Sequence, residues 1–159
     1  MTYRFYLFKL TMAGLLGAAA SMPSAVTKAQ DIEKKVISSA NAPEAIGPYS
    51  QAIQVGKTVY LSGQIAIDPK TKQLTADSSI DDQARLALDN LKAVLAAAGL
   101  TMDHIVATTV FLKDMNDFGK MNAVYATFFK NAPPARATVE VARLPRDAKI
   151  EISAIAMVP

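Results

Sequence analysis

Near its C-terminus the chain reads Pro133-Pro-Ala-Arg-Ala-Thr-Val-Glu-Val-Ala-Arg-Leu-Pro-Arg-Asp-Ala-Lys-Ile-Glu-Ile-Ser-Ala-Ile-Ala156. Two strand-like runs flank a turn-rich break at residues 144–148, a pattern that predicts a closing β-hairpin. Within these runs Arg136 and Glu151 stand among small and branched apolar residues, where a charge is costly unless it is paired or used. A hairpin would bring the two side chains together. A guanidinium can bind a carboxylate ligand and a neighbouring carboxylate can polarise a water, so the pair predicts an active site for a small organic acid.

The rest of the chain supplies strands and helices around this hairpin. Strands are expected at residues 36–38, 51–55, 58–62 and 105–112, with Gly56-Lys57 forming a tight turn between the second and the third. A helical apolar stripe runs from Ile80 to Ala98, with an N-cap among residues 77–79 and Gly99 as the terminating glycine. A second helix is expected after Asn116 as its cap.

This order of elements predicts an α+β domain with two helices on one face of a single mixed sheet. The other face of the sheet still carries apolar residues. In a chain of this size, that face is most simply buried against another subunit.

Residues 1–29 are expected to form a secretory signal peptide, leaving residues 30–159 as the mature domain. A short basic start is followed by an uncharged apolar run, residues 10–22, then by Pro23 and small residues suited to cleavage. The alternative is an uncleaved membrane anchor, although the apolar run is shorter than the roughly 20 residues of a bilayer span. We therefore expect a periplasmic or secreted protein that no longer contacts the membrane after cleavage.

Removing residues 1–29 changes the charge of the chain. Three of the 17 Lys and Arg residues lie there and none of the 14 Asp and Glu residues does, so residues 30–159 carry 14 of each and no net charge. This balance argues against a nucleic-acid partner. The chain has no cysteine and one histidine, His104, which excludes thiol catalysis and argues against a metal site.

Six motifs of the chain occur in the same order in a known protein family. They are Asn41-Ala-Pro-Glu-Ala-Ile-Gly-Pro-Tyr-Ser50, Leu61-Ser-Gly-Gln64, Thr109-Val-Phe-Leu-Lys-Asp114, Asn116-Asp-Phe118, Asn122-Ala-Val-Tyr125 and Pro134-Ala-Arg-Ala-Thr-Val-Glu-Val-Ala-Arg-Leu-Pro145. Over roughly residues 34–157 the chain resembles the Rid family, formerly YjgF, and most closely its RidA subgroup of enamine and imine deaminases. The resemblance implies a chorismate-mutase-like α+β fold and a homotrimeric barrel with active sites in clefts between subunits.

The resemblance also implies a role for individual residues. Arg136 matches the arginine that binds the substrate carboxylate, Glu151 the glutamate that positions the attacking water, and Tyr49 the tyrosine that lines the pocket. Four further positions match the cleft wall that binds substrate: Ser62, Gly63, Asn122 and Thr138. Thr138 departs from the family, because many members carry cysteine there.

The implied activity is hydrolytic deamination of reactive 2-enamino and 2-imino acids to 2-oxo acids and ammonia, as by a 2-iminobutanoate/2-iminopropanoate deaminase, with no metal or organic cofactor. The partners would be these small acids and two further copies of the chain, with both Arg136 and Glu151 of a site coming from one chain. The alternative is an exported trimer that binds small carboxylates, or acts like a chaperone, without catalysis.

Three of the site residues also have a purely structural interpretation. Arg136 could form an ion pair with Glu140 or Glu151 that closes the hairpin. Glu151 could be a solvent-facing strand residue, and Gly63 a bend or bulge.

Overall fold

Six strands and two α-helices make up the described part of the chain, in the order that the sequence predicts. A computed structural model describes residues 31–74 and 77–159, and the residues from Ile32 to Pro159 form one compact unit. The elements are β1 (Lys35–Ile37), β2 (Ala52–Val55), β3 (Thr58–Gln64), α1 (Ile80–Ala97), β4 (Ile105–Leu112), α2 (Phe118–Phe128), β5 (Ala135–Glu140) and β6 (Ile150–Met157). The predicted signal peptide lies outside the described residues. No helix among those described is both long and apolar enough to cross a membrane.

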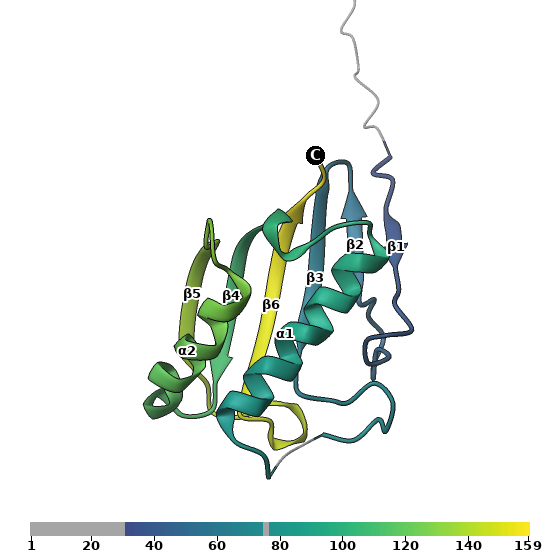
Figure 1. The fold of residues 1–159 in the computed structure, drawn as a ribbon. Helices are drawn as coiled ribbons and strands as arrows, with labels where there is room; N and C mark the ends of the chain where they lie inside the picture. The colour runs from purple at the N-terminus through teal and green to yellow at the C-terminus, as the bar shows by residue number, and fades with distance from the viewer. Residues whose placement is uncertain (1–30, 75–76) are drawn as a thin grey trace, which may run out of the picture. The chain divides into compact units, whose positions relative to one another are not determined.

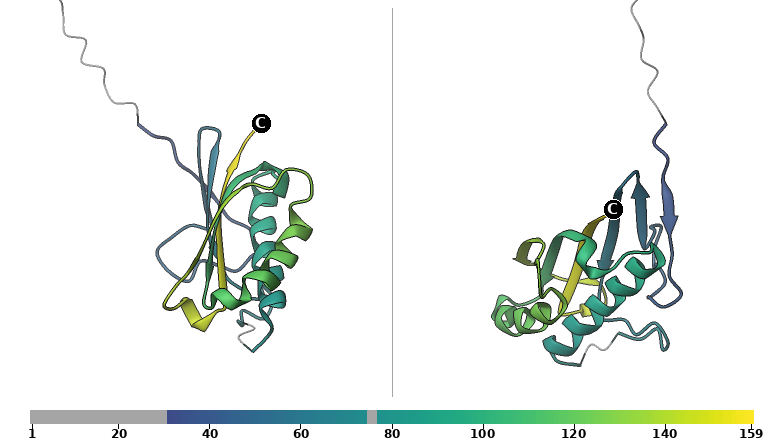
Figure 2. Two further views of the ribbon diagram at one scale, coloured as in Figure 1. Left: turned by 90° about the vertical axis from the view of Figure 1, so that its left-hand side faces the viewer. Right: turned by 45° about the horizontal axis from the view of Figure 1, so that its top comes forward.

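The strands form one mixed sheet in the order β1-β2-β3-β6-β4-β5. All neighbours are antiparallel except β4 and β5, which run parallel. Both helices pack on the same face of the sheet, as Figure 1 shows from the helix side and the left view of Figure 2 shows edge-on. The predicted fold class, an α+β domain with two helices on one face, is therefore confirmed.

The predicted turns and caps of the first half of the chain are confirmed. Val55 pairs with Thr58 around Gly56, whose φ of +56° suits a glycine in a tight hairpin. Ser79 caps α1 by accepting a hydrogen bond of 3.2 Å from the backbone N–H of Asp82. Gly99, with a φ of +73°, follows the end of the helix as expected.

The predicted cap of the second helix is wrong. Asn116 lies in a 3₁₀ turn, Met115–Asp117, that precedes α2. The Asp114 side chain caps this turn by accepting a hydrogen bond of 2.8 Å from the backbone N–H of Asn116. Asn116 is therefore the residue whose backbone N–H is capped, and the capping carboxylate belongs to Asp114, two positions earlier.

The predicted hairpin between the last two strands is also wrong. Strand β4 lies between β5 and β6, with Thr108 opposite Arg136 and Phe111 opposite Glu151. The reason is that the segment of residues 141–149 crosses the end of β4 instead of turning back on β5, while α2 provides the crossover that a parallel β4–β5 pair requires. Arg136 and Glu151 consequently belong to strands that are not neighbours in the sheet.

The two faces of the sheet differ in how they are covered. The main core lies between the sheet and the helices, and on β6 it takes every second residue: Ile150, Ile152, Ala154 and Ala156. On the opposite face, a row of cross-strand neighbours runs over four strands: Val36, Ile53, Tyr60 and Ile155. Three of them are well exposed, with Val36 at 63%, Tyr60 at 51% and Ile155 at 36%. This face is apolar and largely uncovered in a single chain, as the sequence predicts.

Candidate functional site

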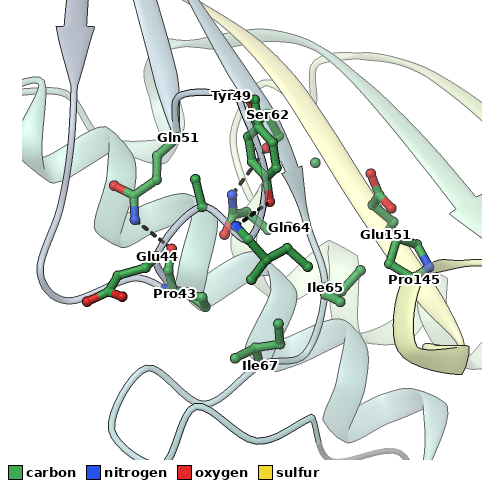
Figure 3. Close-up of a pocket in the computed structure, with 13 residues that line it drawn as sticks. Pro43, Glu44, Tyr49, Gln51, Ser62, Gln64, Ile65, Ile67, Pro145 and Glu151 are labelled. Carbon is green, nitrogen blue, oxygen red and sulfur yellow. Dashed lines mark hydrogen bonds between the residues drawn. The ribbon is translucent and has the colours of Figure 1, made fainter.

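A pocket of about 360 Å³ opens on the sheet face that carries no helix. Its wall combines the loop before β2, the end of β3, the segment after β3, Pro145, and Glu151 of β6 (Figure 3). Four of the seven predicted site residues line it: Tyr49, Ser62, Gly63 and Glu151. The structure therefore brings together residues that are up to 102 positions apart in the sequence.

Glu151 is the titratable group of this pocket whose pKa is clearly shifted. Its side chain is half-buried beside its cross-strand neighbour Phe111, and within the described part of the chain its carboxylate has no hydrogen-bond or ion-pair partner. Burial raises the pKa of Glu151 above its ordinary value. A carboxylate in this state is a better proton acceptor than one in water, which suits it to hold and deprotonate a water molecule.

Gly63 is the residue that makes room for this carboxylate. It lies where the register between β3 and β6 shifts, so the bulge expected for a strand glycine is present. A Cβ atom at this position would meet the Glu151 side chain, with Cδ only 2.7 Å away. The bulge and the missing side chain together allow Glu151 to lie over the backbone of β3.

Tyr49 and Ser62 are tied to the loop that forms the outer wall. The Tyr49 hydroxyl accepts a hydrogen bond of 3.3 Å from the backbone N–H of Ile46. The Ser62 hydroxyl donates a bond of 2.7 Å to the carbonyl of Ser50, which fixes the chain directly after Tyr49. Tyr49 remains 48% exposed, so its ring forms the rim of the pocket.

The other three predicted residues lie on the helix-covered face. Thr108, the cross-strand neighbour of Arg136, bonds Tyr125 of α2, and the Arg136 guanidinium carbon lies 4.5 Å from the centre of the Tyr125 ring. Thr138 is two residues further along the same face of β5, and its buried hydroxyl oxygen lacks a partner in the described part of the chain. Asn122 stands on α2, one turn before Tyr125.

Arg136 does not form the ion pair that a structural role would require. In the described part of the chain its guanidinium has no carboxylate partner, and Glu140 instead accepts a hydrogen bond of 2.8 Å from the backbone N–H of Met115. The donors of Arg136 are therefore free to bind an anion.

Sequence reasoning missed the buried amides that position the pocket wall. Gln51 is 5% exposed and its side chain bonds the backbone of residues 39–43, with 2.6 Å to both the Ser39 N–H and the Pro43 carbonyl. Asn90 of α1 donates bonds of 3.1 and 3.0 Å to the carbonyls of Ile65 and Ile67. For Asn90 the available signal was a polar residue on the apolar face of α1, three positions after Ala87 and four before Val94.

Within residues 31–74 and 77–159, no three acidic or histidine side chains gather closely enough to hold a metal ion. The predicted site residues offer a carboxylate, a guanidinium, hydroxyls and backbone groups.

Comparisons with known proteins agree with this fold. A family model described as endoribonuclease L-PSP matches residues 39–158. The 2-iminobutanoate/2-iminopropanoate deaminase of Escherichia coli K12 is 55% identical over 126 residues, which are 77% of this chain and 97% of that protein. The mouse protein of the same name is 51% identical over 126 residues, covering 79% of this chain and 93% of its own length.

Solved structures give the same assignment. The crystal structure of the YjgF gene product of E. coli is 52% identical, with a TM-score of 0.75 over 79% of this chain and 99% of that one. The chain therefore belongs to the endoribonuclease L-PSP family, also known as the Rid or YjgF family, and has homologues that are RidA-type deaminases.

Proposed function

We propose that this protein is a hydrolytic deaminase of reactive 2-enamino and 2-imino acids. The observation that carries the proposal is a pair of complementary groups: a guanidinium with free donors at Arg136 and a partly buried carboxylate with a raised pKa at Glu151. The deaminase names of relatives at 51% and 55% identity support the same reaction.

In the proposed reaction, Arg136 binds the carboxylate of the substrate through its planar fork. Glu151 orients a water toward the imine carbon and accepts one of its protons as the C–O bond forms. The product of this addition is a carbinolamine, which takes a proton on its nitrogen. It then expels ammonia as the C–N bond breaks and its hydroxyl gives up a proton, so that the oxygen becomes the carbonyl of a 2-oxo acid. Water supplies the oxygen, so the reaction balances without an oxidant.

We further propose that each complete site combines residues of two copies of the chain. Arg136 and Glu151 of one chain lie on opposite faces of its sheet, so one chain cannot place both on the same small substrate. The apolar row of Val36, Ile53, Tyr60 and Ile155 gives a second copy a surface to cover. A homotrimer, as the family resemblance implies, would repeat this contact three times. This replaces the expectation that one chain supplies both residues.

The test uses ammonia release from freshly generated 2-aminoacrylate. Arg136→Ala and Glu151→Gln should each abolish acceleration, and Arg136→Lys should not restore it, because an ammonium cannot reproduce the fork. Unchanged turnover by Arg136→Ala would contradict the function. Binding of 2-oxo acids by the wild-type protein without any turnover would instead favour the non-catalytic binder.

Mixing the two inactive variants tests the shared site. Random assembly makes about three quarters of the trimers mixed, and each mixed trimer holds one site with both wild-type residues among its three. Coexpression of Arg136→Ala and Glu151→Gln chains should therefore restore about one quarter of wild-type activity. No recovery in verified mixed trimers would show that both residues act within one chain.

We also propose that the protein is exported and loses residues up to about Ala29. The basic start, the uncharged run and the small residues before Gln30 support this proposal, and the family match begins only at residue 39. Mass spectrometry of the protein from fractionated cells should find a periplasmic or secreted chain that starts near Gln30. A chain with an intact Met1 in the membrane fraction would indicate an uncleaved anchor.

A further inference from the structure

Among the described residues, Arg136 is held by aromatic rings and not by an acid. Its guanidinium carbon lies 4.5 Å from the centre of the Tyr125 ring and 5.8 Å from that of Phe118, and both rings belong to α2. A cation within about 6 Å of a ring face is attracted by the ring quadrupole. These contacts leave the N–H groups of the guanidinium without a partner among the described residues, whereas an ion pair would occupy them.

The Tyr125 ring is itself fixed on several sides. It is 5% exposed, and its hydroxyl shares a hydrogen bond of 2.7 Å with Thr108. The Phe129 ring packs against it with 4.5 Å between centres. Thr108 is also the residue of β4 that lies opposite Arg136 on β5. Tyr125 is therefore hydrogen-bonded to the residue of β4 that pairs with Arg136 on β5.

These contacts limit where the guanidinium can be. Arg136 is an exposed residue on an edge strand, and without a partner its side chain would sample many rotamers. Ordering such a side chain on ligand binding costs affinity, and a side chain that is already held in place avoids most of that cost. Because the donors stay unpaired, the held guanidinium remains competent for a carboxylate.

We propose that Tyr125 is a positioning residue that presents Arg136 to the substrate carboxylate, with Thr108 fixing the orientation of its ring. The inference rests on the proposed function, in which Arg136 binds that carboxylate. It assigns Tyr125 a role beyond its place in the core: removing the ring should weaken carboxylate binding and leave the chemical step at Glu151 intact.

The kinetic test compares two substitutions of Tyr125. Tyr125→Leu removes the ring and should raise KM for a 2-imino acid about tenfold, with kcat changed by less than about threefold, because Arg136 still contacts the bound carboxylate and only the cost of ordering its side chain rises. Tyr125→Phe keeps the ring and should stay within about threefold of wild type in KM. The dissociation constant of 2-oxobutanoate, measured by calorimetry, should follow KM in both variants. An unchanged KM in a folded Tyr125→Leu protein, or equal effects in the two variants, would overturn the proposal.

A spectroscopic test needs no substitution that risks the fold. The Nε proton of Arg136 in the wild-type protein should resonate upfield of the Arg143 Nε proton, since Arg136 stacks on a ring and Arg143 instead donates a bond of 2.9 Å to Asp147. Arg136→Lys identifies the signal. An Arg136 resonance at the position of a freely solvated arginine would show that the stacked arrangement is absent in solution and would also overturn the proposal.

The two proposals fail in different ways. If Arg136→Ala leaves turnover unchanged, the proposed function is wrong, whatever Tyr125 does. If Arg136→Ala abolishes turnover and binding of 2-oxobutanoate while Tyr125→Leu changes neither, only the positioning role is wrong.

Discussion

The Glu151 side chain fills the space that a side chain on residue 63 would need, so only glycine fits at position 63 without moving the glutamate. The Glu151 carboxyl group lies over the β3 backbone at the bulge, where a Cβ on residue 63 would stand 2.7 Å from its Cδ and 2.9 Å from its Cγ. Both atoms are well inside van der Waals contact, so any residue larger than glycine has to displace the glutamate. The glycine thereby determines where the carboxylate of the site points.

Gly63→Ala should therefore lower kcat/KM by about 100-fold, the loss expected from moving a catalytic group by about 1 Å. The matched control is Gly119→Ala on α2, where a Cβ would meet nothing within 4 Å and alanine favours the helix. Steady-state kinetics and circular dichroism of both variants check this. A Gly63→Ala enzyme with normal activity would show that Glu151 tolerates displacement.

The rate should depend on the protonation of Glu151. If its carboxylate accepts a proton from water, kcat should rise as pH increases through a pKa higher than the ordinary glutamate value of 4.5, because burial stabilises the neutral acid. The measurement is a pH–rate profile from pH 4 to 9 with the non-enzymatic rate subtracted. In the Glu151→Gln variant the rise of kcat with pH should be absent, because the activity itself is lost.

The same shift has a defined sign for stability. An acid whose pKa is raised by folding holds its proton more tightly in the native state, so the free energy of unfolding falls as pH rises from 4.5 through the raised value. Glu151→Gln should accordingly leave the melting temperature unchanged at pH 4 and raise it at pH 8. Thermal melts at both pH values, with Glu44→Gln on the exposed rim as control, check this; equal effects at both pH values would contradict the sign.

Gln51 should be a stability residue of the pocket wall. Gln51→Leu leaves the buried Ser39 N–H and the Pro43 carbonyl without the partners they now have at 2.6 Å, and each unpaired buried group costs about 1–3 kcal/mol. We expect a loss of roughly 2–4 kcal/mol in denaturant unfolding. The control, Gln54→Leu, removes one exposed bond to Gly56 and should change stability by less than about 0.5 kcal/mol.

Thr138 carries a buried hydroxyl oxygen without a partner in the described residues. Thr138→Val should raise stability by up to about 1 kcal/mol in the isolated chain, since a polar group no longer has to be desolvated. Thr138→Cys, the residue of many relatives by resemblance, should keep turnover within about threefold of wild type. Chemical unfolding and steady-state kinetics measure the two effects; a destabilised Thr138→Val protein would mean that the hydroxyl has a partner in solution.

Local sequence patterns determined most of the elements. The 3.6-residue stripe from Ile80 placed α1, and the β-branched run of residues 105–112 placed β4 with the bounds that the structure has. A glycine that needs a positive φ marked the hairpin at Gly56. These signals succeed because helix and turn formation depend on neighbours within a few residues.

Signals that depend on distant contacts failed. The apolar stripe of α1 did not predict that Gln83 and Asn90 are buried; Asn90 bonds the segment after β3, and Gln83 accepts a bond from the Lys149 N–H. The turn-rich break at residues 144–148 indicated a hairpin, yet β4 occupies the place beside β5. Nothing within those segments encodes which strand becomes the neighbour.

The sequence by itself determined which residue types carry the site: an arginine and a glutamate in apolar strands, a tyrosine after Gly-Pro, and a strand glycine. Only the tertiary structure decided that these residues fall into two groups, with Arg136 on the helix-covered face and Glu151 on the open one. The physical reason is that alternation along a strand fixes only which residues share a face. Strand order and helix packing, which arise from contacts across the whole chain, decide which face each group joins.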